Sequence, residues 1–441
     1  MFQTLKKAWG VPEIRKKLLY TLLMVVIFRL GSAITVPFLD SEVVKDWMDT
    51  SASDGNFLEY LNILTGGALS QATIFSLSIT PFINASIIMQ LLTFALPPLE
   101  RMRDEGEEGR KKIDKITGFV ALVLAFFMAY AYYLTLKRKT TAIKYTEGGE
   151  GVFAAAVIIL CFVAGASFVV WMGNRISDKG IGNGVSMLLF AGIAARFPSD
   201  AGLLIKLSKS SIENNENGKY LWISLAYLVF IIFEIAFIVF MNEAERRIPI
   251  QYAKRVVGRK QFGGQKSHIP IKICMSGVMP IIFAMSFMAL PQTIELFKGQ
   301  PTRTSGFYYH FCEFFKRTSW TYAALYFLLI IAFNYFYVSI QYNPVEIANN
   351  LRQSNGGIPG IRPGKPTSDY IQRVLNKITL VGAFFLGIIA IIPIFIGMAD
   401  SSLQSLSMGG TTILIAVGVA LETTRTLESH LMMRHHKGFL Q

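Results

Sequence analysis

The chain has 441 residues, of which 52% are hydrophobic and only 16% are charged, and its formal net charge is +14. Soluble domains usually carry about 25% charged residues, so this composition excludes an ordinary soluble globular protein and indicates a protein that crosses a membrane several times. The chain has three cysteines and five histidines, and neither type shows the spacing of a disulfide framework or a metal site.

Long apolar runs recur along the whole chain. Each is close to the ~20 residues that cross a hydrocarbon core of about 30 Å as a helix. The runs are continuous rather than alternating, which favours helices over the strands of a membrane barrel. We therefore predict an all-α polytopic membrane protein with ten transmembrane helices, at about residues 18–39, 76–96, 116–136, 152–172, 184–205, 220–241, 273–294, 320–340, 378–399 and 407–421.

The distribution of Lys and Arg predicts the orientation in the membrane. An even number of spans places both termini on one side. The predicted loops on that side hold 29 Lys and Arg residues, and the opposite loops hold 13. Because positively charged loops are retained on the cytoplasmic side, we expect both termini in the cytoplasm. The positive net charge then reflects this topology and contact with anionic lipid headgroups or a cytosolic partner.

A polar segment divides the spans into two equal sets. We predict an N-terminal half (1–198), a hinge loop (199–219) and a C-terminal half (220–441). Each half has five spans, and since five is odd, the second half enters the membrane inverted relative to the first. The second span of each half carries a proline, Pro81 and Pro280, and matched interruptions of this kind point to a transport pathway. Proline is also common in membrane helices generally, which leaves an ordinary packing role open.

The region ahead of Pro81 is too long for one span. No charge occurs over the 40 residues from Tyr60 to Leu99, and one helix of that length would measure about 60 Å. Gly66 and Gly67 are poor helix-interior residues and supply the break. We expect a re-entrant half-helix at about 61–73, buried in protein or lining a wet cavity.

Polar side chains follow Pro81 within the same apolar run. Asn84, Ser86 and Gln90 are hydrogen-bonding residues in a segment that is otherwise apolar. Such groups either hold helices together or line a route through the membrane, and the sequence leaves both readings open.

Two of the predicted cytoplasmic loops are long and basic. Residues 242–272 carry eight Lys and Arg residues, and residues 341–377 carry five. Both contain Pro, Gly and apolar residues, which is typical of ordered rather than low-complexity loops. They are candidates for binding lipid headgroups, RNA or an acidic protein surface, with a purely solvated loop as the alternative.

Six segments stand out in order along nearly the whole chain. They are TIFSLSITPFINASIIMQ (73–90), DKGIGNGVSMLLFAGI (178–193), ERRIPIQYAKR (245–255), NPVEIANNL (343–351), PGIRPG (359–364) and GGTTILI (409–415). Together they resemble segments of the SecY family, the channel subunit of the Sec protein translocase. The sequence around the fifth segment resembles the bacterial form.

This resemblance implies two five-helix halves that close around an hourglass pore. A ring of aliphatic side chains narrows the waist, and a short plug fills the outer funnel. A lateral gate lies between the second and third helices and the seventh and eighth. Matched position by position, the ring falls on Ile79, Ile83, Val185, Leu189, Ile282 and Ile415, and the plug residues are Leu61, Leu64, Gly66, Gly67, Ala68 and Leu69.

The resemblance also implies a lateral gate and a contact surface for cytosolic partners. The gate residues are Asn84, Gln90 and Leu290, and the motor or ribosome contacts are Arg255, Arg259, Lys260 and Arg362. Ser78 stands where glycine is usual in the family, and Val185 and Leu189 replace isoleucine but stay aliphatic. For each arginine and lysine, a generic positive charge on a cytoplasmic loop is the alternative.

The function that the resemblance implies is a protein-conducting channel in the bacterial cytoplasmic (inner) membrane. It would pass unfolded secretory polypeptides and release apolar segments laterally into lipid, driven by a SecA-like motor ATPase or the ribosome. Small SecE-like and SecG-like membrane subunits, precursors that bear signal sequences, and membrane lipids are the other partners. The chain itself is not expected to be an enzyme or to need a cofactor or metal, because it has no HExxH motif, nucleotide-binding loop or carboxylate pair within a span.

The strongest alternative is a secondary transporter of a small solute. Such a transporter shares inverted repeats and broken helices, but it needs ionisable groups at mid-membrane to bind its substrate or coupling ion. The predicted spans offer only Arg29 and Glu234, and neither lies beside the two prolines in sequence. A helix-packing role and a partner contact remain open for Glu234.

Overall fold

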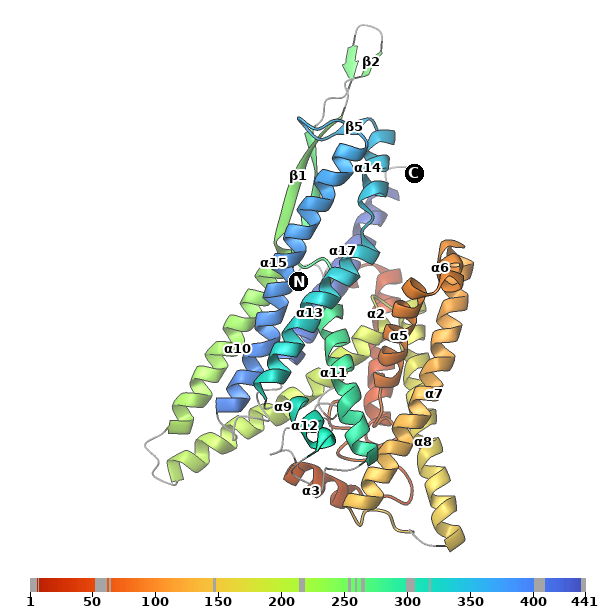
Figure 1. Ribbon diagram of the computed structural model, residues 1–441, viewed down its shortest axis with the longest axis vertical. Coiled ribbons are helices and arrows are strands. Elements are labelled where there is room, and N and C mark those ends of the chain that lie inside the picture. The colour runs from red at the N-terminus through yellow and green to blue at the C-terminus, as the bar shows by residue number, and fades with distance from the viewer. Residues whose placement is uncertain are drawn as a thin grey trace.

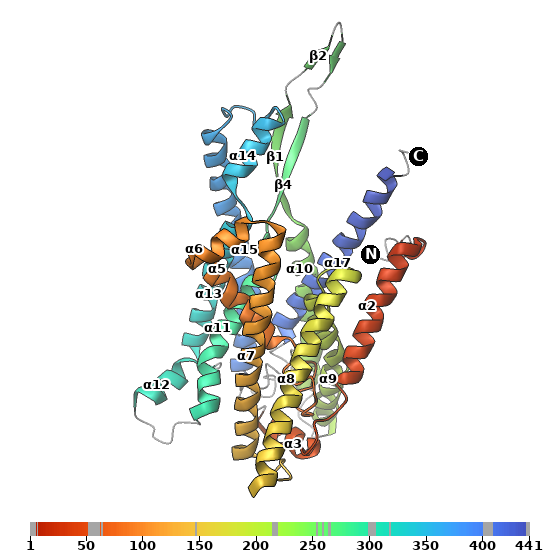
Figure 2. The ribbon, with the colours of Figure 1, turned by 90° about the vertical axis from the view of Figure 1, so that its right-hand side faces the viewer.

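The computed structural model describes most of the chain as a bundle of long helices with a small sheet at one end (Figures 1 and 2). It describes residues 6, 8–51, 62, 65–145, 148–213, 219–252, 255–257, 260–262, 266–298, 306–316, 319–399 and 409–437. The side chains of β2, β3, Leu290 and several helix ends lie outside this description.

Each of the ten predicted apolar runs coincides with one long helix. By length and hydropathy alone, five helices of the described residues qualify as membrane spans, or six if the bent pair of α5 and α6 counts as one. The helices at the ten runs are α2 (Pro12–Gly31), α5 (Thr80–Ala95), α7 (Glu107–Lys139), α8 (Gly148–Lys179), α9 (Gly184–Glu213), α10 (Lys219–Glu243), α11 (Met279–Lys298), α13 (Trp320–Gln341), α15 (Lys365–Ala399) and α17 (Gly409–Lys437).

Several helix boundaries differ from the prediction. The first helix was expected at 18–39 but ends at Gly31, and the chain then folds over the bundle and buries Val36 and Leu39. In the C-terminal half, α15 begins at Lys365 instead of about 378. Hydropathy detects only the part of a helix that lies in hydrocarbon, so it misses turns that continue into the polar region on either side.

The hinge loop expected at 199–219 is wrong over most of its length. Helix α9 continues through it to Glu213, with Pro198 inside the helix. Residues 214–218, which separate α9 from α10, lie outside the described residues. The stretch is polar, but its leucines, isoleucines and lysines are adequate helix formers, and polarity alone does not end a helix at a membrane surface.

The two halves of the bundle are inverted with respect to each other. Helix α5 leads into α6 (Pro97–Asp104) at the end of the bundle that carries the sheet, at an angle of 98°. Helix α11 leads into α12 (Phe307–Phe314) at the opposite end, where α3 (Ser41–Ser51) also lies (Figure 1). Both chain ends lie toward the sheet (Figure 2), as an even number of crossings requires.

A sheet joins the two long basic loops. Strand β1 (Glu245–Tyr252) pairs antiparallel with β4 (Lys266–Lys272) and also with β5 (Gly356–Gly357). Between β1 and β4, the short strands β2 (Arg255–Val257) and β3 (Lys260–Phe262) form a hairpin that projects from the bundle (Figure 1). Helix α14 (Pro344–Gln353) precedes β5, and the side chain of Asn343 caps it by accepting from two backbone N–H groups.

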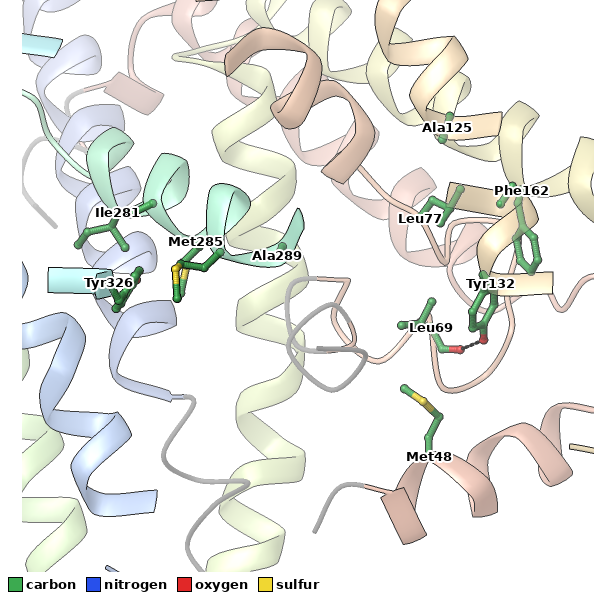
Figure 3. Close-up of a cluster of buried hydrophobic side chains, with 14 of the residues drawn as sticks. Met48, Leu69, Leu77, Ala125, Tyr132, Phe162, Ile281, Met285, Ala289 and Tyr326 are labelled. Atoms are coloured by element: carbon green, nitrogen blue, oxygen red, sulfur yellow. Dashed lines mark hydrogen bonds between the residues drawn. The ribbon is translucent and has the colours of Figure 1, made fainter. Parts of the chain in front are cut away.

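The largest buried cluster spans both halves. It includes Leu69 and Tyr132 from the N-terminal half and Met285 and Ala289 of α11 from the C-terminal half (Figure 3). Large apolar side chains also remain exposed on the outside of the bundle, such as Leu22 (62%), Phe119 (69%) and Ile232 (67%). In a soluble protein such exposure would be costly, whereas in lipid these side chains face a solvent as apolar as themselves.

Candidate functional site

A run of turns leads into the second helix of the N-terminal half. We call residues 72–79 the α5 lead-in. Ser78 within it has a φ of +46°, in the left-handed region that favours glycine. Pro81 stands in the first turn of α5. It therefore begins the helix, whereas the sequence analysis expected it to interrupt a span. Its missing N–H has no helical partner at that position, so the proline costs nothing there.

The second helix of the C-terminal half begins with the same combination of a left-handed residue and a proline. We call residues 273–278 the α11 lead-in. Gly277 has a φ of +59°, and Pro280 is the second residue of α11. Ser78 and Gly277 each stand three residues before the proline. The matched prolines that the sequence singled out therefore belong to matched turns.

Each lead-in packs closely against a glycine in the fourth span of its half. A Cβ built on Gly165 of α8 would lie 2.0 Å from the carbonyl oxygen of Ile74. A Cβ built on Gly382 of α15 would lie 2.6 Å from the carbonyl oxygen of Ile273. Both carbonyls stand seven residues before the proline of their half. Only glycine permits these approaches, and the sequence analysis missed both because the contacts join residues far apart in the chain.

Residues 65–71 precede the α5 lead-in and form the described part of the predicted plug. Gly66 and Gly67 have φ values of +67° and +88°, which confirms the break expected there. Residues 65–70 form consecutive turns, where a half-helix was expected. The Asn62 side chain accepts from the Ser70 N–H at 2.9 Å, and its carbonyl accepts from the Gly67 N–H at 2.8 Å, so local polar groups replace a helical ladder.

The plug residues are buried against the N-terminal half. Ala68 and Leu69 are 2% and 1% exposed. A Cβ built on Gly66 would lie 2.5 Å from the carbonyl oxygen of Gly192 in α9. On the other side, the Tyr132 hydroxyl of α7 donates to the carbonyl oxygen of Leu69 at 2.8 Å (Figure 3). The predicted plug residues Leu61 and Leu64 lie outside the described residues.

The loop after α2 holds the base of this segment. The Val36 N–H donates to the Ala72 carbonyl at 3.0 Å, and the Ile74 N–H donates to the Ile34 carbonyl at 3.0 Å. These two bonds form a short antiparallel pairing across Thr35 and Thr73. They satisfy backbone groups that would otherwise be unpaired in an apolar surrounding.

The six predicted ring residues fall into two apolar clusters that meet along α9. Ile79, Ile83, Val185 and Leu189 belong to one cluster. Ile282 and Ile415 belong to the other, together with Ile193 and the partly buried Phe190 of α9. Ile79, Leu189 and Ile415 are buried, and Ile83, Val185 and Ile282 are partly buried. Ile83 and Ile282 each stand two residues after the proline of their half.

The two halves touch along the helices to which the predicted gate residues belong. Helix α11 packs against α5 and α7, and the rings of Phe94 in α5 and Phe336 in α13 meet edge to face at 5.7 Å. Asn84 and Gln90 are partly buried, and among the described residues the buried Asn84 Oδ1 has no hydrogen-bond partner. For Leu290 only the backbone is described, within α11. The aromatic pair was missed because no sequence pattern relates its two members.

A small core joins the two long basic loops into one unit. Ile248 and Ile250 of β1 pack with Leu351 of α14 and with Ile371 and Leu375 of α15. Arg362 is exposed just after β5, and its carbonyl accepts from the Thr367 hydroxyl at 2.8 Å. Arg255 and Lys260 lie in β2 and β3 without described side chains, and Arg259 lies outside the described residues.

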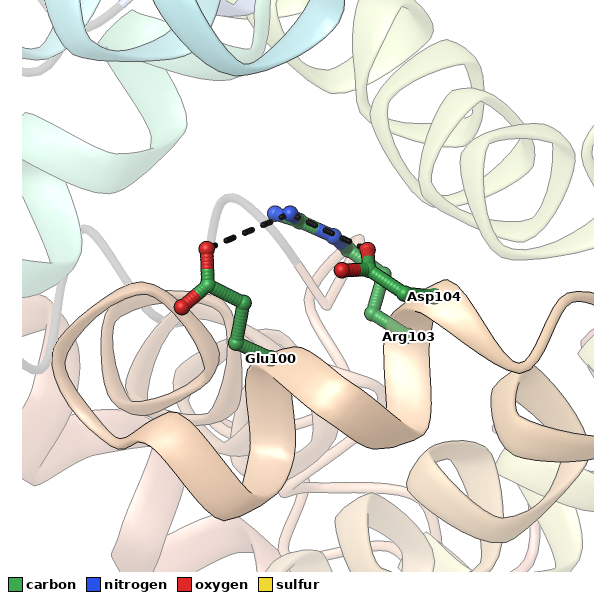
Figure 4. A network of polar contacts seen from close by, with 3 residues as sticks. All are labelled: Glu100, Arg103 and Asp104. Atoms are coloured by element: carbon green, nitrogen blue, oxygen red, sulfur yellow. Dashed lines mark hydrogen bonds and ion pairs between the residues drawn. The ribbon is translucent and has the colours of Figure 1, made fainter.

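Charged groups gather where the sheet meets the helices. The Arg425 guanidinium of α17 donates to the carbonyl of Asn242 at the end of α10 at 2.8 Å. Partial burial of Lys272, together with this guanidinium nearby, lowers the pKa of its ammonium from the ordinary value, against the opposing pull of Glu245 and Glu243. On α6, Arg103 lies 3.9 Å from Glu100 and 3.5 Å from Asp104 (Figure 4), an exposed network that contributes little stability.

The two ionisable groups embedded in the spans lie apart from the lead-in prolines. Arg29 of α2 has a guanidinium nitrogen 3.1 Å from a Cβ built on Gly66, so it borders the plug segment. Glu234 of α10 is buried, and among the described residues its Oε2 has no hydrogen-bond partner. Neither forms the paired mid-membrane site that a solute transporter would need.

Comparison with known proteins gives one consistent result. A family model described as SecY matches residues 73–424. The protein translocase subunits SecY of Streptomyces coelicolor and Thermotoga maritima are each 38% identical to this chain, over 100% of it and 100% and 98% of their own lengths. A solved protein-conducting channel superposes with a TM-score of 0.65 at 19% identity, covering 96% of each chain. A solved SecY whose plug domain is described as maintaining a membrane seal superposes with a TM-score of 0.64 at 18% identity.

Proposed function

The chain belongs to the SecY family of protein translocase subunits, and we propose that it forms the channel through which unfolded secretory polypeptides cross a bacterial cytoplasmic membrane. The bundle of apolar helices makes it a multi-pass membrane protein. The excess of Lys and Arg at the end with the sheet supports a cytoplasmic position for that end and for both termini.

The observation that carries this proposal is the equivalent position of Ile83 and Ile282 in the two halves. Each follows the lead-in proline of its half by two residues, and each lies in an aliphatic cluster that borders α9. A ring of such side chains bars ions because water leaves a narrow apolar constriction. It forms no specific bonds with a passing chain, so side chains of any kind can slide through it.

The plug completes the seal in this proposal. Residues 66–69 contact α7 and α9, and the backbone pairing with the loop after α2 holds their base, which supports a plug docked in the N-terminal half. Leu61 and Leu64 would extend the same plug. Displacement of a segment held by few polar bonds is feasible on the timescale of local opening.

Lateral release of apolar segments would use the contact between the halves. Parting α5 and α7 from α11 and α13 would break the Phe94–Phe336 contact and expose Asn84 and Gln90. An apolar signal sequence that enters this gap gains about 25 cal/mol for each Å² of apolar surface that it removes from water. Asn84, with its unpartnered amide oxygen, would offer an acceptor at this gate.

The driving force would come from partners. The sheet unit presents Arg362 and the hairpin with Arg255, Arg259 and Lys260 for contact with a SecA-like motor ATPase or the ribosome. ATP hydrolysis would occur in the motor, and this chain would supply the passage. Small SecE-like and SecG-like membrane subunits would pack on the exposed apolar faces of the bundle.

Photo-crosslinking of a stalled precursor tests the proposal. A photoreactive residue is placed at Ile83, at Ile282 or, as a control, at the lipid-exposed Leu22. A secretory precursor is then stalled during translocation into vesicles. We expect adducts at Ile83 and Ile282 that require the motor and an intact signal sequence, and none at Leu22. Unimpaired translocation without adducts at either isoleucine would move the pathway elsewhere.

A further inference from the structure

We propose that Tyr132 is the positioning residue that holds the plug in its docked place, through the hydrogen bond from its hydroxyl to the carbonyl of Leu69 (Figure 3). This inference rests on the proposed channel function. It assigns a role to a residue of the third span that no sequence motif singled out.

The bond joins two deeply buried partners. The hydroxyl of Tyr132 lies 2.8 Å from the Leu69 carbonyl oxygen, and the two residues are 3% and 1% exposed. No water competes for a donor and an acceptor in such a setting, so the bond is directional and short. The plug also contacts α9 at Gly66, where its backbone approaches the carbonyl oxygen of Gly192 closely but forms no hydrogen bond that is given for the described residues.

A neighbouring aromatic ring packs against the ring of Tyr132. It is the ring of Phe162 in α8, which meets it edge to face with centroids 5.4 Å apart. Ala125 and Ala129 lie on the same face of α7, are at most 2% exposed, and belong to the same buried cluster. A rigid aromatic side chain loses little conformational freedom when its hydroxyl donates to a partner.

The Leu69 carbonyl has a second donor. The N–H of Ala72 also donates to it, at 3.1 Å. Loss of the tyrosine hydroxyl therefore leaves the carbonyl satisfied, and the fold does not have to absorb an unpaired buried group. Removing the hydroxyl should change where the plug rests and leave the stability of the bundle nearly unchanged.

The position of Tyr132 links the plug to the gate. Helix α7 is one of the helices that α11 packs against, and Tyr132 and Leu69 share one buried cluster with Met285 and Met288 of α11. Tyr132 therefore lies between the plug segment and the part of α7 that shares a buried cluster with α11, at the contact between the halves.

The test compares Tyr132→Phe with Tyr133→Phe, a neighbouring buried tyrosine for which the structure gives no bond to the plug. The three native cysteines are first replaced, and Ala68→Cys in the plug, at a position only 2% exposed, reports docking. An impermeant maleimide added on the outer side measures its exposure. We expect Y132F to raise both the labelling rate and the ion leak of resting channels about three- to tenfold, the effect of one buried hydrogen bond. Y133F should change neither.

Rescue separates positioning from general structural damage. A 4-aminophenylalanine at position 132 keeps a donor on a ring of the same shape and should restore slow labelling and the seal. A 4-methylphenylalanine has no donor and should behave like Y132F. Equal labelling rates in Y132F and in the parent channel would overturn the inference, as would a seal restored by 4-methylphenylalanine.

The same preparations separate failure of the inference from failure of the channel proposal. Precursor adducts at Ile83 and Ile282, with labelling of position 68 unaffected by Y132F, would leave the channel standing and remove Tyr132 from plug control. Absence of adducts in the parent channel would remove the pathway itself, whatever the labelling rates.

Discussion

The α5 and α11 lead-ins share a left-handed residue three positions before a proline. They differ in the segment that precedes each of them and in the hydrogen bonds that hold them. The α11 lead-in follows directly from strand β4, which ends at Lys272. The α5 lead-in follows a stretch of extra turns, residues 65–71, that reaches α7 and α9. The α11 lead-in therefore joins its helix to the sheet, and the α5 lead-in joins its helix to the segment proposed as the plug.

The anchors differ in the same direction. In the C-terminal half, the Ser276 hydroxyl donates to the Asn334 side chain of α13, whose amide donates to the Thr379 carbonyl of α15 at 2.9 Å. In the N-terminal half, the corresponding third span offers a single tyrosine hydroxyl. The α11 lead-in is thus tied to its third span by a chain of buried side-chain bonds, whereas the third span of the N-terminal half reaches the plug by one hydroxyl and the loop after α2 holds the α5 lead-in through its backbone.

The largest effects should come from the isoleucines at the matched ring position. Ile83→Gly and Ile282→Gly each remove a packed side chain, so each should lower the free energy of unfolding by about 2 kcal/mol or more and open a leak of ions. Ion leaks of similar size from both variants would support equivalent roles for the two isoleucines. Ile232→Gly on the lipid-exposed face of α10 is the control, because it carries the same glycine cost without the packing. Single-channel recording of reconstituted protein measures the leak, and unchanged conductance would remove the ring assignment.

The next effect concerns the glycines that receive the lead-ins. Gly165→Ala and Gly382→Ala should each destabilise the protein by about 1–3 kcal/mol, because the new Cβ meets a backbone carbonyl. Gly165→Ala should also raise the ion leak, since it shifts the base of the plug. Gly118→Ala on α7, where a Cβ meets nothing within 4 Å, should do neither. Thermal unfolding in detergent measures the loss of stability. Equal melting temperatures for all three variants would contradict the close backbone approaches at Gly165 and Gly382.

The polar anchor of the C-terminal half should have an intermediate effect. Asn334→Ala leaves Ser276 and the Thr379 carbonyl without this partner, so it should cost about 1–2 kcal/mol. Ser276→Ala removes one member and should cost about 0.6 kcal/mol, the average for such bonds in membranes. Denaturant unfolding of the reconstituted protein gives both values. A larger loss from Ser276→Ala than from Asn334→Ala would contradict the network as described.

Substitutions of the left-handed residues should change stability by about 1 kcal/mol or less. Gly277→Ala should cost about 1 kcal/mol, because its φ of +59° strains any residue with a Cβ while no atom lies within 4 Å to add a clash. Ser78→Gly should gain a few tenths of a kcal/mol at most, since relief of strain is offset by greater freedom of the unfolded chain. Gly202→Ala inside α9 is the control and should be neutral or stabilising. Melting curves in one detergent rank the three.

Much of the fold could be predicted because the membrane restricts what a sequence can do. Ten apolar runs give ten helices, and the Gly66–Gly67 pair marks the break in an uncharged stretch too long for one span. The wrong boundaries, such as the helical continuation of α9 to Glu213, lie in polar regions where the membrane imposes no such restriction. The prolines were recognised as a matched pair, but their role as helix starts depends on backbone angles that hydropathy does not report.

The sequence by itself indicated where the long apolar helices lie, the inversion of the halves and the aliphatic character of the residues after each proline, because these follow from hydrophobicity and from the parity of the spans. Only the tertiary structure decided that Gly165 and Gly382 receive the two lead-ins, that Tyr132 reaches Leu69, and that Phe94 meets Phe336. Each of these contacts joins helices distant in the chain. Within the bilayer, packing shape and individual hydrogen bonds select such partners. The surrounding lipid is as apolar as the side chains, so the hydropathy of a helix does not indicate which other helix it contacts.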